Sequence, residues 1–450
     1  AGTVGSTLAI SLSKEDNDIT VVDENQATLH HLEEEADIST IVGSCSYPTT
    51  LVNAGIKEAD MVVAVTGSDE INIVSSLMSK VLSPNVKTIA RIRESSYLQN
   101  KTKAAIDAGV IPVDIVVSPE KLITNHIQAL IDTPGSLQVL EFGDGLLYLV
   151  GVRAVSGGPL IGHEIADLKK HMPNVDTRVA AIFRSGGAII PKGTTTVMAG
   201  DEVFFIARKK DAKRVINEMR TKEDPYKYVV IAGGGKIGSS LAEQIEDNHR
   251  VKIIESDPSR AKKISESLLD TIVLEGNVSD KSLLHEENIE DCDVFVAVTN
   301  DDEANVMSCM LAKEMGAHKV IALINNEAYV DLVQGKSIDV AIAPSQITIG
   351  TFLSELAGDE VVKVHSLRRG VAEAIETIVR PSPNGNGDVV GKELGTIKLP
   401  LGATIGAIIR KKKAKIAHDN VKLRENDHVI LFLTDKKLLP QIKDIFSPYQ

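Results

Sequence analysis

Short apolar runs alternate with segments of helical periodicity along most of this chain. In the second half, five apolar runs of strand length are separated by amphipathic stretches with the spacing of helices. Such alternation is typical of βαβ units and predicts a doubly wound parallel sheet. The predicted strands are "YVVIAGG" from Tyr228, "RVKIIES" from Arg250, "DTIVLEG" from Asp270, "DVFVAVT" from Asp293 and "KVIALI" from Lys319.

The same pattern occurs twice, at an offset of about 233 residues. The segment "NDITVVDEN" from Asn17 aligns with "HRVKIIESD" from His249. A longer segment, "GSCSYPTTLVNAGIKEADMVVAVTGSDEINI" from Gly43, aligns with "GNVSDKSLLHEENIEDCDVFVAVTNDDEANV" from Gly276. The two halves are therefore duplicated units, each with its own sheet.

Each predicted sheet is followed by an amphipathic helix and then by a smaller region rich in hairpin-like strands. In these regions Gly200-Asp201 and Asn426-Asp427 form a turn directly before an apolar strand. The segments around Pro225 and "RPSPNGNGD" from Arg380 read as linker and loop. The fold class predicted is α/β, with two Rossmann-like doubly wound parallel-sheet domains, each followed by a small α+β domain. We place the domains at residues 1–133 (N1), 134–221 (C1), 222–358 (N2) and 359–450 (C2).

Composition narrows the class of protein. A chain of 450 residues that is 43% apolar can bury several cores, and its formal net charge of −13 argues against nucleic acid as a partner. Its three cysteines are too few and too scattered for a disulfide framework or a metal site. No apolar stretch has the length of a membrane span, so we expect a soluble, cytoplasmic protein.

The second unit carries a G-x-G-x-x-G turn between a strand and a helix. Gly233 permits the tight turn, Gly235 lets the backbone approach a pyrophosphate, and Gly238 allows close packing of helix on sheet, with Lys236 and Ile237 between them. Amide groups at such a helix start favour phosphates. Glu255 ends the next strand and is suited to bind ribose hydroxyls, which favours NAD or adenosine over NADP. The alternative is that the glycines serve only packing.

The first unit begins inside the equivalent turn. Gly2 and Gly5 match the second and third glycines, with Thr3 and Val4 between them, and Asp23 matches Glu255. The opening strand and the first glycine have no counterpart, so we expect part of the natural N-terminus to be absent. Packing alone is again the alternative reading of these glycines.

Two further groups recur at the ends of later strands. Thr66 and Thr299 close the fourth strand and precede "GSDEIN" and "NDDEAN", in which Asp302 and its neighbours either serve a ligand or only cap a helix. At the fifth strand the first unit has Arg91 and Arg93, where the second has leucine and asparagine. Alternate strand residues share a face, so these arginines either converge on a polyphosphate or form a salt-bridged surface.

The tandem organisation, the paired "AVT...DE.N" segments and "SLRRGVAEAIE" from Ser366 resemble the TrkA family of Trk potassium uptake proteins. That family carries two RCK (regulator of conductance of potassium, or KTN) units, and the resemblance covers essentially the whole chain. It implies a protein without catalysis of its own. It implies a cytoplasmic ring, usually a homotetramer, docked on the inner face of the plasma membrane through the membrane-embedded Trk potassium channel subunit.

The resemblance also implies ligands and their pockets. By position, Gly2, Gly5, Asp23, Thr66 and Arg91 would line a first nucleotide pocket, with Arg93 reaching a phosphate across a subunit boundary. The second pocket would comprise Gly233, Gly235, Gly238, Glu255, Thr299 and Asp302. The arginine difference suggests ATP or ADP at the first pocket and NAD(H) at the second, with the third phosphate of ATP shifting the ring between two shapes.

Two alternatives stay open. An NAD-dependent dehydrogenase would need a proton-transfer residue and a substrate domain, and no histidine or lysine recurs at both sheet edges. The basic segment "RKKKAK" from Arg410 either meets lipid headgroups or channel loops, or is a solvated hairpin.

Overall fold

The computed structural model describes residues 2–14, 17–333, 335, 337–356, 361–367, 372–381, 389–418 and 420–446. Most of the predicted loop "RPSPNGNGD" and part of "SLRRGVAEAIE" lie outside these residues. The chain forms two compact units: Ala1–Leu122 together with Pro344–Glu355, and Ile123–Ala343 together with Leu356–Gln450. Among the described residues, no helix is long and apolar enough to cross a bilayer.

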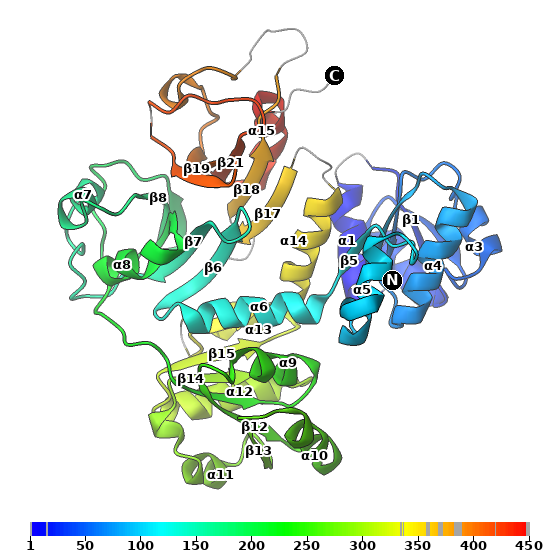
Figure 1. Cartoon of the computed structure of the whole chain (residues 1–450), viewed down its shortest axis with the longest axis horizontal. Coiled ribbons are helices and arrows are strands. Elements are labelled where there is room, and N and C mark those ends of the chain that lie inside the picture. Colours follow the sequence, from blue (N-terminus) through cyan, green and yellow to red (C-terminus); the bar gives the residue numbers. More distant parts are fainter. Residues whose placement is uncertain are drawn as a thin grey trace. The chain divides into compact units, whose positions relative to one another are not determined.

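The second unit contains a complete six-stranded parallel sheet with the order β13-β12-β11-β14-β15-β16 (Figure 1). From β11 the chain winds outward through β12 and β13, then returns to β14 and winds the other way. This topology confirms the predicted doubly wound sheet and places its switch point between β11 and β14. The strands are β11 (Tyr228–Ala232), β12 (Arg250–Glu255), β13 (Ile272–Glu275), β14 (Val294–Ala297), β15 (Lys319–Leu323) and β16 (Val340–Ile342).

The helices of this domain connect the strands and pack on the sheet. Central strands β11 and β14 are buried along their whole length, as expected for parallel strands covered on both faces. The helices are α9 (Lys236–Ile245), α10 (Pro258–Ser267), α11 (Lys281–Glu286), α12 (Asp302–Glu314) and α13 (Glu327–Val333).

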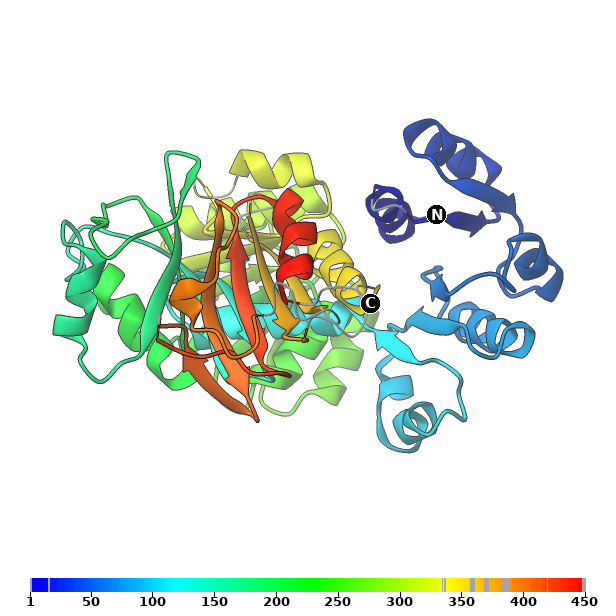
Figure 2. The ribbon, with the colours of Figure 1, turned by 90° about the horizontal axis from the view of Figure 1, so that it is seen from above.

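Among the described residues, the strands of the first N domain follow the order of the second domain, with no counterpart of β11. β1 pairs in parallel with β2, and β3, β4 and β5 form a separate three-stranded sheet (Figure 2). In the second domain β11 lies between β12 and β14, the counterparts of β1 and β3, and pairs with both. The strands are β1 (Thr20–Asp23), β2 (Ser39–Val42), β3 (Met61–Ala64), β4 (Lys87–Arg91) and β5 (Ile115–Val117).

The two N domains differ in how deeply equivalent strands are buried. No residue of β1 is buried, whereas five of the six residues of its counterpart β12 are. The helices are α1 (Thr3–Ser13), α2 (Gln26–Glu35), α3 (Pro48–Asn53), α4 (Asp69–Leu82) and α5 (Asn100–Asp107). Nearly all of α14 (Pro344–Leu356) belongs to this compact unit, although it follows the second sheet in the sequence.

In the part of the chain that the structure describes, each C domain is an antiparallel five-stranded sheet, accompanied by two helices in the first domain and one in the second. The orders β6-β7-β10-β8-β9 and β17-β18-β21-β19-β20 are equivalent, which confirms the predicted duplication of a small α+β fold. The first comprises β6 (Ser136–Phe142), β7 (Leu147–Arg153), α7 (Leu168–His171), β8 (Thr177–Arg184), β9 (Gly187–Ile189), β10 (Glu202–Arg208) and α8 (Lys209–Met219). The second comprises β17 (Val361–Leu367), β18 (Ala372–Ile378), β19 (Ala403–Arg410), β20 (Lys413–Ile416), β21 (His428–Leu433) and α15 (Leu439–Phe446). Single 3₁₀ turns occur at Ser95–Leu98, Ile165–Asp167, Ile289–Asp291, Leu394–Thr396 and Lys436–Leu438.

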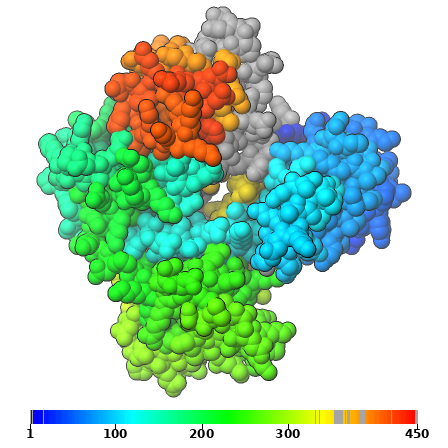
Figure 3. All heavy atoms as spheres, viewed as in Figure 1, coloured from blue at the N-terminus to red at the C-terminus, as the bar shows by residue number. Residues whose placement is uncertain are grey.

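The two C domains pack on each other through one shared apolar core. Figure 3 shows the orange and red atoms of the second C domain directly beside the teal and green atoms of the first. Phe142, Phe204 and Ile206 of the first lie in the same cluster as Ile409 and Phe432 of the second. Polar contacts join them as well, because Arg178 donates to the carbonyl oxygen of Ala417 and His418 lies 2.9 Å from a carboxylate oxygen of Asp176. Each C sheet therefore buries one face against its duplicate.

A buried lysine joins the second N domain to the first C domain. Lys319, at the start of β15, is 4% exposed, and its ammonium donates to the carbonyl oxygens of Leu130 and Ser136. Leu130 lies in the last turn of α6 (Pro119–Asp132), whose carbonyl end attracts a positive charge. Tyr226, in the linker, contacts the same ammonium with its ring. The boundaries drawn at 133, 221 and 358 stay predictions, since the compact units divide the chain along other lines.

Candidate functional site

The second glycine turn has the geometry that its spacing predicts. Gly233 follows β11 with φ +106°, and a Cβ there would lie 3.0 Å from the amide nitrogen of Thr299. A Cβ on Gly238 would lie only 1.9 Å from the carbonyl oxygen of Gly233. Both positions therefore require glycine, the first for conformation and closeness and the second for the packing of α9 against the turn.

Gly235 differs from its two partners. It is the N-cap of α9, no side chain caps the helix there, and a Cβ on it would have no heavy atom within 4 Å. Lys236, exposed, and Ile237, half-buried, follow in the first turn of the helix. The space beside Gly235 at the start of α9 is thus open, and a helix start is where a phosphate binds.

Glu255 ends β12 beside this turn and is 3% exposed. Its Oε2 accepts the N–H of Gly234 at 2.9 Å, and its Oε1 accepts the N–H of Asp257 at 2.8 Å. Burial by itself raises the pKa of this carboxyl. The two N–H groups and the charge of Arg260 lower the pKa by more than burial raises it, so it lies below the usual value. The residue is therefore a fixed carboxylate next to the glycine turn.

Sequence reasoning missed Arg260. It lies in the first turn of α10, and its Nη1 is 3.2 Å from Oε2 of Glu255. Its side chain is about half exposed, so the guanidinium covers the carboxylate from the solvent side. The separation of five residues between an acid at a strand end and an arginine in the next helix was the available signal.

The "AVT...DE.N" motif is held together by its asparagine, which sequence reasoning also passed over. Asn305 is fully buried; its Oδ1 accepts from the backbone and hydroxyl of Thr299, and its Nδ2 donates to the carbonyl oxygen of Leu323. Asn72 does the same for Thr66 and Arg91 in the first domain. Recurrence of this asparagine at one place in both copies was the signal. Thr66 and Thr299 are therefore oriented by the fold at the carboxyl edge of each sheet.

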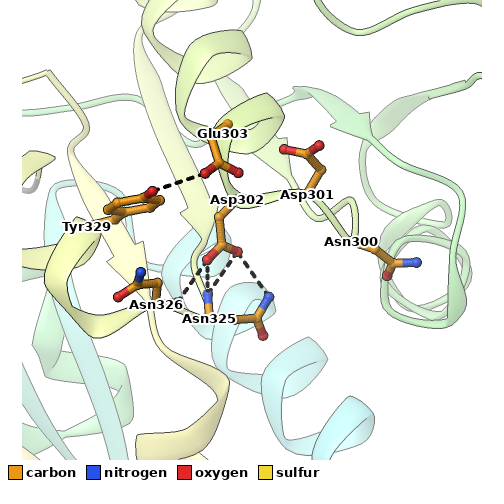
Figure 4. Close-up of a pocket in the computed structure, with 7 residues that line it drawn as sticks. All are labelled: Asn300, Asp301, Asp302, Glu303, Asn325, Asn326 and Tyr329. Carbon is orange, nitrogen blue, oxygen red and sulfur yellow. Dashed lines mark hydrogen bonds between the residues drawn. The ribbon is translucent and has the colours of Figure 1, made fainter.

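Asp302 is used by the fold too. Its carboxylate accepts the backbone N–H groups of Asn325 and Asn326 and the side-chain amide of Asn325, which ties the start of α12 to the loop after β15 (Figure 4). The cap of α12 is supplied by its neighbour Asp301, whose Oδ1 accepts the N–H of Ala304, so the printed bonds of Asp302 serve the loop and not the cap. These residues border an open pocket of about 380 Å³, lined by Asn300, Asp301, Asp302, Glu303, Asn325, Asn326 and Tyr329. Among the described residues, no group of three or more His, Cys, Asp or Glu is arranged to hold a metal ion.

The first N domain keeps the helix start of the turn. Gly2 is the N-cap of α1, which begins at Thr3 and Val4, and a Cβ on Gly2 would have no heavy atom within 4 Å. Gly5 lies close to β3, since a Cβ there would be 3.3 Å from the side chain of Val65. Asp23 ends β1, and its carboxylate accepts the N–H of Asn25 at 2.8 Å.

Arg91 and Arg93 both reach the loop between β3 and α4. The Nη2 of Arg91 donates to the carbonyl oxygen of Thr66 at 2.7 Å, and Arg93 donates to that of Gly67. Arg93 is also 3.8 Å from Asp69, so the salt-bridged alternative holds in part for this residue. Burial, and then the neighbouring charge of Arg93, lower the pKa of Arg91. The two guanidinium groups thus approach one loop, as the alternation of the strand predicts.

Fold and site together define a protein of two tandem Rossmann-like units, of which the second has a complete glycine turn and the first has the helix start of one. The TrkA-N domain model matches residues 1–119 and 229–344, and the TrkA-C domain model matches 149–220. The chain is 51% identical to the Trk system potassium uptake protein TrkA of Halomonas elongata over 99% of this chain and 97% of that protein. It is 48% identical to the protein of that name from Vibrio alginolyticus, over 100% and 97%. The chain belongs to the TrkA family of Trk system potassium uptake proteins, which confirms the resemblance.

Solved structures support the fold. The GsuK RCK domain matches with a TM-score of 0.60 at 17% identity, covering 99% of this chain and 93% of that one. The GsuK channel bound to NAD matches with a TM-score of 0.61 at 17% identity, covering 100% and 78%. Both chains share the RCK fold with this protein.

Proposed function

We propose that this chain is the cytoplasmic regulatory subunit of a Trk-type potassium uptake channel. In this proposal it binds ATP or ADP and NAD(H) in its N domains and couples the ligand to the conformation of a ring, most simply a homotetramer. It has no catalytic residue of its own, and it reaches the inner face of the plasma membrane through the membrane-embedded channel subunit. Membership of the TrkA family supports this assignment.

One observation carries the nucleotide part of the proposal. Gly235 leaves the amide end of α9 open to an incoming group, while Glu255 is held as a carboxylate at the end of the adjacent strand. A dinucleotide needs both features, because its pyrophosphate binds the helix start and its ribose hydroxyls bind the acid. For Glu255 to take the ribose, the side chain of Arg260 would swing toward solvent, which its exposure permits.

We assign NAD(H) to the second N domain and ATP or ADP to the first. The carboxylate of Glu255 disfavours a 2′-phosphate at the second site, and related chains have been solved as "GsuK channel bound to NAD" and as GsuK bound to ADP. At the first site Arg91 and Arg93 supply two cationic groups where the equivalent positions of the second site hold leucine and asparagine. The negative end of a polyphosphate would displace their present carbonyl contacts.

Exposed apolar side chains support self-assembly. Val74, Leu77 and Val81 form a stripe along α4 and are 40%, 38% and 65% exposed. Met307 and Met310 occupy the matching face of α12 at 60% and 38%. Apolar stripes on both N domains would be covered in a ring of repeated N domains, where each contacts its neighbour.

The assignment of the two ligands can be tested with one pair of equivalent substitutions. Gly235→Ala and Gly2→Ala each add a methyl group where no atom lies within 4 Å, so both should leave the fold intact while blocking phosphate approach. We expect Gly235→Ala to weaken NADH binding at least tenfold and to leave ATP binding unchanged, and Gly2→Ala to do the reverse. Calorimetric titration of each variant decides the matter. Unchanged NADH affinity in Gly235→Ala would reject the second site.

The phosphate sensor is tested separately. If the third phosphate meets the two arginines, Arg91→Ala and Arg93→Ala should lose most of the preference for ATP over ADP, by about tenfold each. Lys87, on the same strand but away from its carboxyl end, provides the control Lys87→Ala. An unchanged ratio of ATP to ADP affinity in both arginine variants would discard the sensor.

The rival function is an NAD-dependent dehydrogenase. It shares the glycine turn and Glu255, so binding of NADH does not separate the two proposals. Absorbance of NADH in the presence of candidate alcohols, hydroxy acids and their oxidised forms does separate them. Robust turnover would replace the regulator proposal by the enzyme.

A further inference from the structure

The two C domains contain the same hairpin, joined by a two-residue turn. Arg184 pairs with Gly187 across β8 and β9, and Arg410 pairs with Lys413 across β19 and β20. The turn residues are Ser185 and Gly186 in the first domain and Lys411 and Lys412 in the second, with φ values of +49°, +88°, +48° and +59°. The backbone path is therefore shared, and only the side chains differ.

The second turn uses residues that the backbone disfavours. Two-residue hairpin turns with positive φ at both positions select Asn, Asp and Gly, because a larger side chain crowds the backbone there. Ser185-Gly186 meets that preference in part, whereas Lys411-Lys412 opposes it twice. Stability of the hairpin does not account for this pair of lysines, so their charge or reach has another use.

We define the lysine hairpin as Lys411, Lys412, Lys413 and Lys415, and all four residues are exposed. None of the four forms an ion pair with any residue that the structure describes. Arg410 behaves differently, because it makes a two-pronged ion pair with buried Asp427, just as Arg184 does with Asp201. The arginine pair is a shared part of the C fold, and the lysines are an addition found in one copy.

The chemistry of the lysine hairpin indicates that its binding partner is an extended anionic surface and not a single anionic group. Lysine is a hydrated point charge on a flexible stem and lacks the planar fork that selects a single carboxylate or phosphate. No aromatic residue lies between Arg410 and Ile416, so stacking on nucleic-acid bases is not available there. A sheet of lipid headgroups needs neither a fork nor a stacking surface.

We propose that the lysine hairpin contacts the anionic phospholipid headgroups of a bilayer directly. The proposal draws on the proposed function only for bringing the chain to a membrane. The chain carries a net charge of −13, so an anionic bilayer repels most of its surface and attracts this hairpin within a Debye length of about 8–10 Å. The contact therefore sets which part of the chain faces the lipid.

The test is flotation of the full purified chain with phosphatidylcholine vesicles that contain or lack phosphatidylglycerol. Lys411→Ser combined with Lys412→Gly gives the second hairpin the turn of the first. Since each lysine near an anionic surface contributes about fivefold, the double variant should bind phosphatidylglycerol vesicles roughly 25-fold more weakly. Its melting temperature should equal or exceed that of the unmodified chain, because the turn is relieved.

Charge-matched and charge-retaining variants complete the experiment. Lys262→Ser with Lys263→Ser removes two exposed lysines of α10 and should leave vesicle binding unchanged, while Lys411→Arg with Lys412→Arg should keep it. If the Lys411→Ser, Lys412→Gly variant binds vesicles as tightly as the unmodified chain, the proposal is overturned. So does lysine-dependent binding to DNA or to an acidic peptide of the channel with none to vesicles. No nucleotide or channel is present, so failure here leaves the proposed function standing.

Discussion

At the scale of single residues, one turn contains two glycines with opposite tasks. Gly238 is required by packing, since a Cβ there would overlap the carbonyl oxygen of Gly233, whereas the space around Gly235 is open. Spacing alone does not separate the two roles. The surroundings do, because they tell which glycine the fold needs and which one a ligand would need.

Gly238→Ala should therefore be a folding defect and not a binding defect. An added Cβ would lie only 1.9 Å from the backbone oxygen of Gly233, so α9 must move to make room, and we expect a loss of about 3 kcal/mol or more in the free energy of unfolding. Urea denaturation checks this. Gly235→Ala is the internal control, with an expected loss of about 1 kcal/mol at the helix cap. Equal stability of the two variants would contradict the packing role.

Asn305 offers a second prediction at this scale. Its side chain joins Thr299 to Leu323 and is fully buried, so Asn305→Ala leaves buried carbonyl groups unsatisfied and should lower the free energy of unfolding by about 2–3 kcal/mol. Asn248→Ala, at an exposed turn, should cost less than about 0.5 kcal/mol. Chemical denaturation of both variants measures the difference. A similar loss in each would show that the buried asparagine is dispensable.

At the scale of elements, the start of β15 is joined to the end of α6 by an ammonium group. Burial lowers the pKa of Lys319 to about 8, while Glu223 and Asp339 act in the opposite direction. The charged groups that act on it are Glu223, Asp339, Arg220 and Lys313. Half-buried His126 also faces it, but desolvation lowers the pKa of this histidine to about 4, so it is neutral at pH 7. The contact between the second N domain and α6 thus contains a buried lysine that gives up its proton at a lower pH than a lysine in water.

This predicts a pH dependence with a definite sign. The folded pKa lies below the unfolded value of 10.5, so the unfolded chain binds more protons above pH 8 and the contribution of Lys319 to stability rises from pH 8 to about 10.5. The free energy of unfolding of the unmodified chain minus that of Lys319→Met should therefore become more positive between pH 7 and pH 10. Urea titrations at both pH values test this. If this difference, unmodified chain minus variant, became more negative as the pH rises, the assignment would be contradicted.

At the scale of the whole molecule, two apolar surfaces are left uncovered by the single chain. The apolar stripes on α4 and α12 carry the proposal of a ring, because each would be covered by the N domain of a neighbour. The C domains cover each other within one chain through their shared core.

Leu77→Glu and Met310→Glu should each shift the chain toward smaller assemblies without unfolding it. A charge at the centre of an apolar contact costs about 2 kcal/mol or more per interface, whereas Val110→Glu, at a 76% exposed position off the stripe, should have no effect. Light scattering after size-exclusion chromatography gives the mass, and circular dichroism verifies the fold. Retention of the unmodified mass by both stripe variants would remove this support for the ring.

Local patterns of this sequence determined the duplication, the parallel sheets, the glycine turns and the paired C folds. Strand and helix periods, turn residues and short spacings are encoded within a few residues, so "GGGKIG" and its neighbours could be interpreted without coordinates. The place of Glu255 at a strand end belongs to the same class of inference.

Only the tertiary structure decided how those side chains are used. Asp302 is bound to backbone amides more than twenty residues away, Arg260 covers Glu255, and Lys319 caps a helix from the preceding repeat. The two C domains share one apolar core. Such contacts join residues distant in the sequence, and they depend on which faces of the elements meet, which hydrophobic periodicity leaves undetermined.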